Sequence, residues 1–235
     1  MIEIPFNPIE RAKEVENIVC KDNKRKYYRF RYSRYYAGIV TADSVGCCLL
    51  CAYCWNYFKN LNPEKFGKFY SAKEVCEKLI EISNKKNCKK FRISGAEPIL
   101  GEKSFNHLIE ILEIMKNYAN EFIIETNGII LGYNEKFIDM LEKFIDFVYV
   151  RISIKGYDEK SFEKITGAKG EFFNYQLIAL KNLLDKKFFA WPAIMYETFK
   201  GKLKEFGIKV EEIEIEYLEK YPFVIENLKR RKIEL

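Results

Sequence analysis

Short apolar runs alternate with longer amphipathic stretches along most of the chain. The runs are rich in Ile, Val and Phe and are bounded by turn residues, a pattern typical of buried strands. They predict strands at residues 38–43, 90–94, 121–126, 147–155, 188–194 and 213–216. Apolar residues at helical spacing predict helices near residues 9–20, 134–144, 171–184, 198–206 and 221–231, and another from residue 158 onward.

Two further helices are predicted from their first turns. Ser71-Ala72-Lys73-Glu74 matches a capping box, in which the serine and glutamate side chains bind backbone N–H groups reciprocally. Ser104 precedes a second amphipathic stretch and is expected to cap the helix that contains it. Both stretches follow a predicted strand or turn, so they extend the alternation of strand and helix.

Six strand–helix units predict parallel strands joined by right-handed crossovers. A closed barrel of eight units typically needs about 250 residues, and this chain has 235. The prediction is therefore an α/β fold, a partial (β/α)6 TIM-like barrel with a mostly parallel sheet and outer helices. Residues 1–36 are expected to form an N-terminal arm, and residues 37–235 a single domain that ends in a helix.

Polar side chains alternate with aliphatic ones in the predicted strands, and this period of two places the two sets on opposite faces. We expect the aliphatic set to face the helices, so that Arg92, Glu125 and Arg151 point into the barrel. Buried charges are costly unless they are paired or solvated. The pattern favours an interior that binds a polar substrate, and an antiparallel sheet with one solvated face is the alternative.

Composition adds a few constraints. The net charge of +6 is a mild excess, which does not by itself indicate a nucleic-acid partner. We recognise no signal peptide and no apolar run of membrane-spanning length, so we expect a cytoplasmic protein with reduced cysteines and no membrane partner. Abundant Lys, Glu and Ile, with Gln176 as the only glutamine, favour a thermophilic source.

Three cysteines lie close together directly after the first predicted strand. Cys47, Cys51 and Cys54 have the spacing C-x3-C-x2-C. Iron–sulfur cubes usually take four cysteine ligands, so three from one loop would leave one iron free to bind another molecule. A structural zinc site would need a fourth ligand, and His107, the only histidine, lies far along the chain. A ferredoxin register that starts at Cys48 lacks its fourth cysteine.

The loop resembles the cluster loop of the radical S-adenosylmethionine (SAM) superfamily, including the aromatic residue Tyr53 before the third cysteine. The resemblance covers roughly residues 37–216 and implies that residues 37–235 form a radical SAM domain. In that family the three cysteines hold a [4Fe–4S] cluster whose open iron binds the amino and carboxylate groups of SAM. Reduction splits SAM into methionine and a 5′-deoxyadenosyl radical, which abstracts hydrogen from a substrate.

Further residues that carry the resemblance lie at the ends of later strands. Gly95-Ala96-Glu97-Pro98 is similar to the family's Gly-Gly-Glu-Pro motif, which implies binding of the SAM amino group at Gly95, Ala96 and Glu97. Glu125-Thr126-Asn127-Gly128 resembles a strand end of glycyl-radical-enzyme activases, which implies a cofactor-binding role for Asn127. Ser153-Ile154-Lys155 resembles the activases' Asp-Leu-Lys, whose lysine is associated with the SAM carboxylate, and Ser153 replaces the acid.

The resemblance implies an enzyme, an activase-like oxidoreductase that cleaves SAM reductively with electrons from a ferredoxin or flavodoxin. Its substrate would be a small molecule or a protein partner. An iron–sulfur electron-transfer or binding protein without SAM chemistry is one alternative, and an RNA-modifying radical SAM enzyme is another.

The RNA-modifying alternative rests on residues 24–36, where basic and aromatic residues interleave. We expect this segment instead to pack its rings on the barrel and to leave its charges in water, so we expect no nucleic-acid partner. The charges concerned are Lys24, Arg25, Lys26, Arg29 and Arg31.

Overall fold

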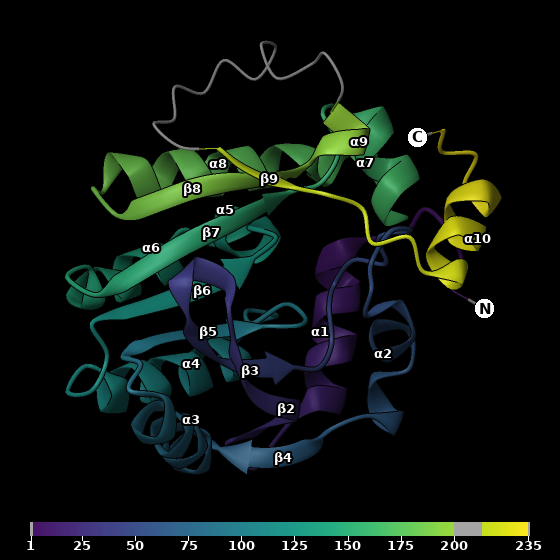
Figure 1. Cartoon of the computed structure of the whole chain (residues 1–235). Helices are drawn as coiled ribbons and strands as arrows, with labels where there is room; N and C mark the ends of the chain where they lie inside the picture. Colours follow the sequence, from purple (N-terminus) through teal and green to yellow (C-terminus); the bar gives the residue numbers. More distant parts are fainter. Residues whose placement is uncertain (1, 200–212, 235) are drawn as a thin grey trace.

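The computed structural model describes residues 2–199 and 213–234. Six parallel strands, in the order β3-β5-β6-β7-β8-β9, form most of one nine-stranded sheet (Figure 1). Within the described residues β9 pairs only with β8, so the sheet stays open. This confirms the predicted α/β fold with a partial (β/α)6 barrel. The bounds are Ile39–Ser44 (β3), Lys90–Ser94 (β5), Glu121–Thr126 (β6), Val148–Ile154 (β7), Phe189–Met195 (β8) and Glu214–Glu216 (β9).

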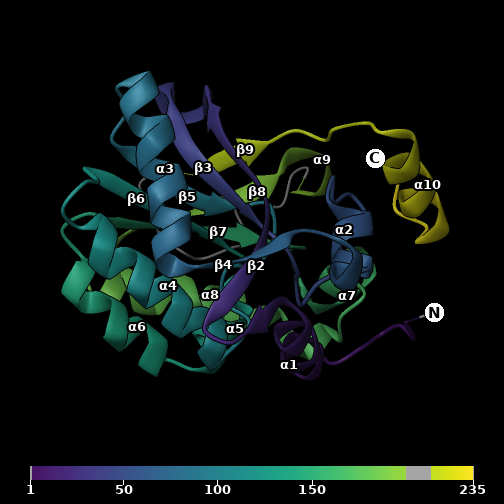
Figure 2. The same cartoon turned by 90° about the horizontal axis from the view of Figure 1, so that it is seen from below.

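Helices cover the outer face of these strands, and Figure 2 shows α4, α5, α6 and α8 together on one side of the sheet. The capping box that starts α3 is confirmed, because the Ser71 hydroxyl accepts from the Glu74 N–H at 3.3 Å and Glu74 accepts from the Ser71 N–H at 2.7 Å. The bounds are Ala72–Lys86 (α3), Glu102–Met115 (α4), Ile129–Tyr133 (α5), Lys136–Leu141 (α6), Glu159–Thr166 (α7) and Phe173–Asp185 (α8).

The N-terminal segment differs from the expectation that no strand precedes residue 38. After helix α1 (Pro8–Val19), strands β1 (Cys20–Lys21) and β2 (Lys24–Ser33) extend the sheet. Strand β2 pairs antiparallel with β3 and with β4 (Lys68–Ser71). The basic and aromatic residues of 24–33 therefore lie in a strand that is paired on both sides. The predicted boundary after residue 36 stays a prediction.

Two charges in β2 that were expected in water are buried. Arg25 is 1% exposed and donates to the Glu97 carbonyl, and Lys26 is 7% exposed and donates to two carbonyls of the segment after α2 (Tyr57–Leu61). Arg29 and Arg31 instead reach the buried carboxylate of Asp43, at 2.7 and 2.8 Å. The expectation is wrong for Arg25 and Lys26, because hydrogen bonds to backbone carbonyls satisfy these cations inside the fold. Lys24 and Arg29 are exposed, as expected.

Smaller differences concern helix ends. Helix α4 begins after Gly101, so Ser104 lies inside its first turn, where its hydroxyl accepts from the Gly101 N–H while Glu16 of α1 accepts from the same hydroxyl. The short helix α5 was not predicted. Of the helix predicted at 198–206, residues 200–206 lie outside the described residues. Short elements complete the chain: helices α9 (Tyr196–Phe199) and α10 (Pro222–Arg230), and 3-10 turns at Tyr35–Ala37, Pro63–Lys65, Glu142–Phe144 and Gly170–Phe172.

The two faces of the parallel strands differ as the alternation predicted. The aliphatic residues of β7, for example Val150 and Ile152, are fully buried in the main core beneath the helices. The opposite face carries Arg92 and Arg151 and, at the amino ends of the strands, a second small apolar cluster. This cluster consists of Ile39, Ile123 and Trp191, with Tyr36 and Tyr149 packed against it; we call it the amino-end plug.

Among the helices that the structure describes, none is long and apolar enough to cross a membrane.

Candidate functional site

The cysteine loop follows β3 and is attached at both sides to the rest of the fold. The Val45 N–H donates to the Lys26 carbonyl of β2 at 3.1 Å. The Leu50 and Ala52 N–H groups donate to carbonyls at the end of α7, at 3.1 and 2.8 Å. These bonds hold the loop at the carboxyl end of β3, the end at which barrel enzymes place their active sites.

The neighbouring residues Cys47 and Cys48 lie in different surroundings. Cys47 is half-buried and its sulfur accepts from the Leu49 N–H at 3.4 Å, whereas Cys48 is fully buried in the core. The Asn127 amide donates to the Cys48 sulfur at 3.3 Å and lies 3.8 Å from the Cys47 sulfur. A hydrogen bond from the Cys48 thiol lowers the pKa of Cys47. These contacts favour Cys47 over Cys48 as the metal-binding thiolate.

Of the other two cysteines of the motif, Cys51 is buried and Cys54 is half-buried. Burial raises the pKa of Cys51 to about 12 and that of Cys54 to about 11. A metal must therefore displace protons from these sulfurs, because the thiolate is the ligand. The seven cysteines are all free of disulfides, so the motif's sulfurs are available for that exchange.

The donor set fits a cluster better than a single ion. Among the described residues, no three His, Cys, Asp or Glu side chains are placed to hold one metal ion. A cube asks for something different, because each of its cysteines binds its own iron. Three sulfurs on one loop, with Cys47 and Cys54 half-buried at its surface, match that requirement.

Glu97 lies in the segment between β5 and α4 and joins three parts of the site. Its carboxylate accepts from the Thr126 hydroxyl at 2.6 Å, the Asn127 N–H at 2.8 Å and the Ile99 N–H at 3.0 Å. Its own N–H donates to the Gly46 carbonyl of the cysteine loop at 3.1 Å. Burial raises the pKa of Glu97 to about 7, so a proton can be held or released there near neutral pH.

Asn56, two residues after Cys54, connects the cysteine loop to the segment after β5. Its buried amide donates to the Gly95 carbonyl at 2.5 Å and to the Tyr28 hydroxyl at 2.9 Å. Gly95 has φ of +86°, and a Cβ at this position would lie 3.0 Å from the Asp43 side chain. Glycine is thus required for the close approach, and Ala96 beside it is half-buried.

Lys155 lies just beyond β7 with a half-buried side chain. Its ammonium sits over the ring of Tyr53, 5.4 Å from the centroid, and so faces the cysteine loop. Gln176 of α8 accepts from the Lys155 N–H at 2.8 Å and fixes the backbone there. Ser153, two residues earlier, accepts from Arg151 at 2.9 Å. The predicted site residues from four strand ends are thereby gathered at one end of the sheet.

The charged residues of the inner face are paired with one another. Arg92 donates to Glu125 at 2.6 Å and to the Thr41 hydroxyl at 2.9 Å. Arg151 pairs with Glu214 at 2.9 Å and Glu216 at 2.8 Å. Burial of opposite charges in contact is tolerated because each satisfies the other. These side chains lie on the inner face of the sheet, as the alternation predicted. That they contact a substrate stays a prediction.

Sequence reasoning missed several residues of the site. Asn56 was not among the predicted site residues, nor was Asn60, whose amide donates to the Cys54 sulfur at 3.6 Å. Arg11 was missed although a signal existed. It precedes Val15 and Val19 at steps of four, which places it on the apolar stripe of α1 and predicts a buried arginine.

Comparisons with curated proteins give partial matches. The chain is 30% identical over 132 residues to "Putative glycyl-radical enzyme activating enzyme" of Methanocaldococcus jannaschii, which covers 56% of this chain and 45% of that protein. It is 33% identical over 129 residues to "Probable GTP 3′,8-cyclase" of Methanococcus aeolicus, which covers 53% of this chain and 39% of that protein. The chain spans less than half the length of either relative.

Solved structures agree on the fold. A radical SAM methyltransferase from Sphaerobacter thermophilus covers 86% of this chain with a TM-score of 0.51 at 9% identity, over 65% of its own length. A spore photoproduct lyase mutant with bound AdoMet and dinucleoside spore photoproduct covers 86% with a TM-score of 0.61 at 12% identity, over 63% of its own length.

The family model described as the radical SAM superfamily matches residues 42–196. This range begins in β3 and ends after β8, so it contains the cysteine loop, Glu97, Asn127 and Lys155. The chain belongs to the radical SAM superfamily, whose cofactors, a [4Fe–4S] cluster and SAM, are those predicted from the cysteine loop.

Proposed function

We propose that this chain is a radical SAM enzyme that cleaves SAM reductively to start hydrogen abstraction from a substrate. The observation that carries the proposal is the gathering of the cysteine loop, Glu97, Asn127 and Lys155 at the carboxyl ends of four neighbouring strands. When bound, the cluster and SAM supply a one-electron cleavage that yields methionine and a 5′-deoxyadenosyl radical. The residues of the chain bind and orient these groups.

Each residue has a task that its surroundings support. Cys47, Cys51 and Cys54 would hold the cluster as thiolates, with the open iron directed to SAM. Lys155 would pair with the SAM carboxylate, a charge-assisted contact that gains strength in a partly buried site. Glu97 already accepts hydrogen bonds from the strand ends, so it would fix the backbone of Gly95 and Ala96 against the SAM amino group.

Asn56 would act as a positioning residue rather than a ligand. Its amide bridges the cysteine loop and the Gly95 carbonyl, so it sets the spacing between the cluster and the segment that receives SAM. Tyr53 would line the same region, because its ring lies under the Lys155 ammonium.

The substrate would be a protein partner, as for the activating enzymes that the chain resembles. The similarity to the Methanocaldococcus jannaschii protein supports this class, and a ferredoxin or flavodoxin would deliver the electron. A small polar molecule is the second candidate, and it would meet Arg92, Glu125 and Arg151 on the inner face. An RNA substrate loses its support, because Arg25 and Lys26 of the basic and aromatic segment are buried.

Product analysis tests the proposal. Anaerobically reconstituted protein, reduced with dithionite and mixed with SAM, should yield 5′-deoxyadenosine and methionine in a chromatographic assay. Cys47→Ala should yield neither, and Lys155→Ala should keep its iron but need a higher SAM concentration. A fully loaded cluster that gives neither product would favour an iron–sulfur carrier without SAM chemistry.

A further inference from the structure

Helix α1 contributes a buried arginine to the surroundings of the cysteine loop. Arg11 is 8% exposed, and the Nη2 atom of its guanidinium group donates to the Asn60 backbone carbonyl at 2.8 Å. Its Nε is buried without a hydrogen-bond partner. Among the residues that the structure describes, no carboxylate lies within ion-pair distance of Arg11, whereas Arg29 and Arg31 both pair with Asp43.

An arginine in this position keeps its charge. Burial lowers the pKa of Arg11, and the groups that oppose this effect most strongly are the thiols of Cys47 and Cys48, ahead of the exposed Glu14. Guanidinium groups nevertheless stay protonated in proteins. A buried positive charge without an anion costs free energy. A negative group in the cysteine site would supply the compensating charge that Arg11 lacks.

A second contact links Arg11 to the cysteine ligands. Asn60 accepts from Arg11 through its carbonyl and donates through its side-chain amide to the Cys54 sulfur at 3.6 Å. Hydrogen bonds through Asn60 thus connect Arg11 to Cys54 of the motif. Hydrogen bonds to the sulfurs and the net charge of the surroundings are the main protein controls on the potential of an iron–sulfur cluster.

We propose that Arg11 is the counter-charge of the cluster, a positioning residue that raises its reduction potential and so eases electron entry from a low-potential donor. The inference rests on the proposed function, since it needs a cluster on Cys47, Cys51 and Cys54. Three thiolates make the site negative, and the electron taken from a ferredoxin, flavodoxin or dithionite adds one more negative charge. A nearby fixed cation stabilises this reduced state more than the oxidised one.

Lys26 provides a matched control. It is a buried cation, 7% exposed, that donates to the carbonyls of Pro63 and Glu64 in the segment that follows Asn60. The only charged group that raises its pKa is Glu64, and no cysteine contributes. Removal of its charge therefore tests the general effect of a lost buried cation in the same region without a direct effect on the cluster.

The test is a redox titration of the reconstituted protein, followed by the EPR signal of the reduced cluster. Arg11→Gln keeps a hydrogen-bond donor and removes the charge, Arg11→Met removes both, and Arg11→Lys keeps the charge. At a fixed applied potential, both neutral variants should show a ratio of reduced to oxidised cluster that is about tenfold lower than the wild type. This corresponds to a reduction potential more negative by roughly 59 mV for one electron. The reduction potentials of Arg11→Lys and Lys26→Met should differ from that of the wild type by less than about a third of that shift.

An unchanged potential in either neutral variant with full iron content would overturn the inference, and so would an equal shift in Lys26→Met. Two neutral variants are used so that one poorly folded protein does not decide the result. The wild-type protein distinguishes this result from a failure of the proposed function. If the proposed function is wrong, the wild type would hold no cluster or give no 5′-deoxyadenosine. If only the role of Arg11 is wrong, the wild type would still cleave SAM.

Discussion

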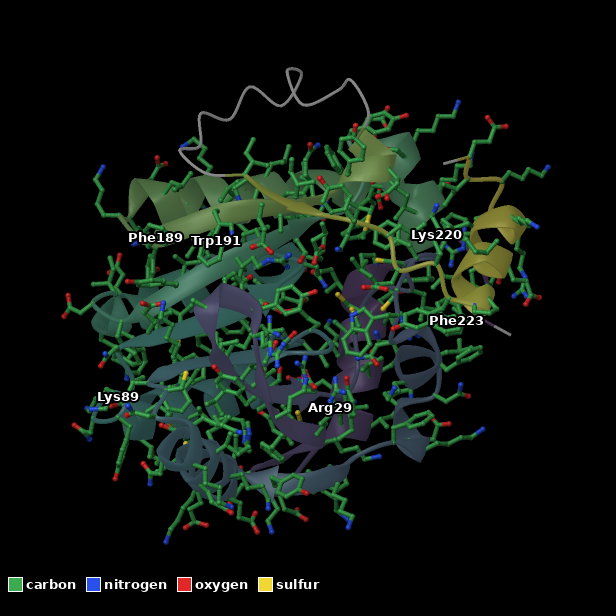
Figure 3. The ribbon with its side chains drawn as sticks, viewed as in Figure 1. Arg29, Lys89, Phe189, Trp191, Lys220 and Phe223 are labelled. Carbon is green, nitrogen blue, oxygen red and sulfur yellow. The ribbon has the colours of Figure 1, made fainter. Side chains whose placement is uncertain are left out.

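The two ends of the six parallel strands are built from different chemistry. At the amino ends, the plug of Ile39, Ile123 and Trp191 closes the inner face with apolar and aromatic side chains. At the carboxyl ends, cysteines and buried polar groups such as Glu97 and Asn127 are held by hydrogen bonds from several loops. Figure 3 shows Phe189 and Trp191 at one end of β8, and Lys220 and Phe223 beyond the opposite end.

The difference teaches where stability and chemistry are placed in this fold. The apolar surface of the plug gains free energy by leaving water, and the polar N–H of Trp191 donates to Glu214. A buried carboxylate or thiol costs free energy unless it is hydrogen bonded, so its retention at the carboxyl ends points to a binding role. Between the two ends lie Arg92 and Arg151 with their paired acids, which stabilise the inner face and border the site.

The largest expected effect separates two neighbouring cysteines at the carboxyl end. Cys47→Ala should lose most bound iron, because it removes a ligand, whereas Cys48→Ala should keep about four irons per chain, because its sulfur lies in the core. Iron analysis after anaerobic reconstitution measures both. Normal loading in Cys47→Ala together with loss in Cys48→Ala would show that the ligand register starts at Cys48.

The next effect concerns the charged layer between the ends. Arg151→Met should lower the free energy of unfolding by about 3 kcal/mol, the low end for a broken buried pair, because it leaves two half-buried carboxylates without their buried cation. These are Glu214 and Glu216. Lys181→Met, which breaks an exposed pair with Asp185, should cost under about 0.5 kcal/mol. Urea denaturation would compare them, and equal costs would contradict the buried role of Arg151.

A pH effect is expected from Glu97. Its folded pKa of about 7 lies above the ordinary value of 4.5, so the folded state binds more protons than the unfolded state between these values. The free energy of unfolding should therefore fall as pH rises from about 4.5 to 7, by up to roughly 3 kcal/mol. Glu97→Gln should remove this part of the slope. Parallel slopes in the two apoproteins would contradict the raised pKa.

The smallest effect tests the amino end. Trp191 donates to Glu214 at 2.9 Å, and Trp191→Phe removes that bond while a ring stays in the plug. The free energy of unfolding should fall by about 1 kcal/mol. Iron content should match the wild type, since the plug is remote from the cysteine loop. Loss of iron in this variant would show that the two ends are coupled.

The predictability of the fold also differs between regions. Strands 90–94 and 121–126 were predicted with the bounds that the structure shows, because each is a short apolar run between turn residues. The segment 24–33 was missed as a strand, since its charges find partners only after folding. Those partners include the Glu97 carbonyl for Arg25 and the Asp43 carboxylate for Arg29. Contacts between residues far apart in sequence cannot be read from local patterns.

The candidate site follows the same rule. The motif spacing predicted Cys47, Cys51 and Cys54, and the resemblance to the radical SAM family predicted roles for Glu97, Asn127 and Lys155 at the ends of later strands. The contacts of Asn56 with Gly95 and of Arg11 with Asn60 depend on loop geometry and on α1. No local pattern records them, apart from the place of Arg11 on the apolar stripe of its helix.

One measurement tests most directly whether the cysteine loop holds a cluster with an open iron that receives SAM. The reduced, reconstituted protein should show an EPR spectrum that changes on addition of SAM, because SAM would bind to that iron. Lys155→Ala should need more SAM for the same change. A fully loaded and reduced cluster whose spectrum is identical with and without saturating SAM would contradict the proposed site.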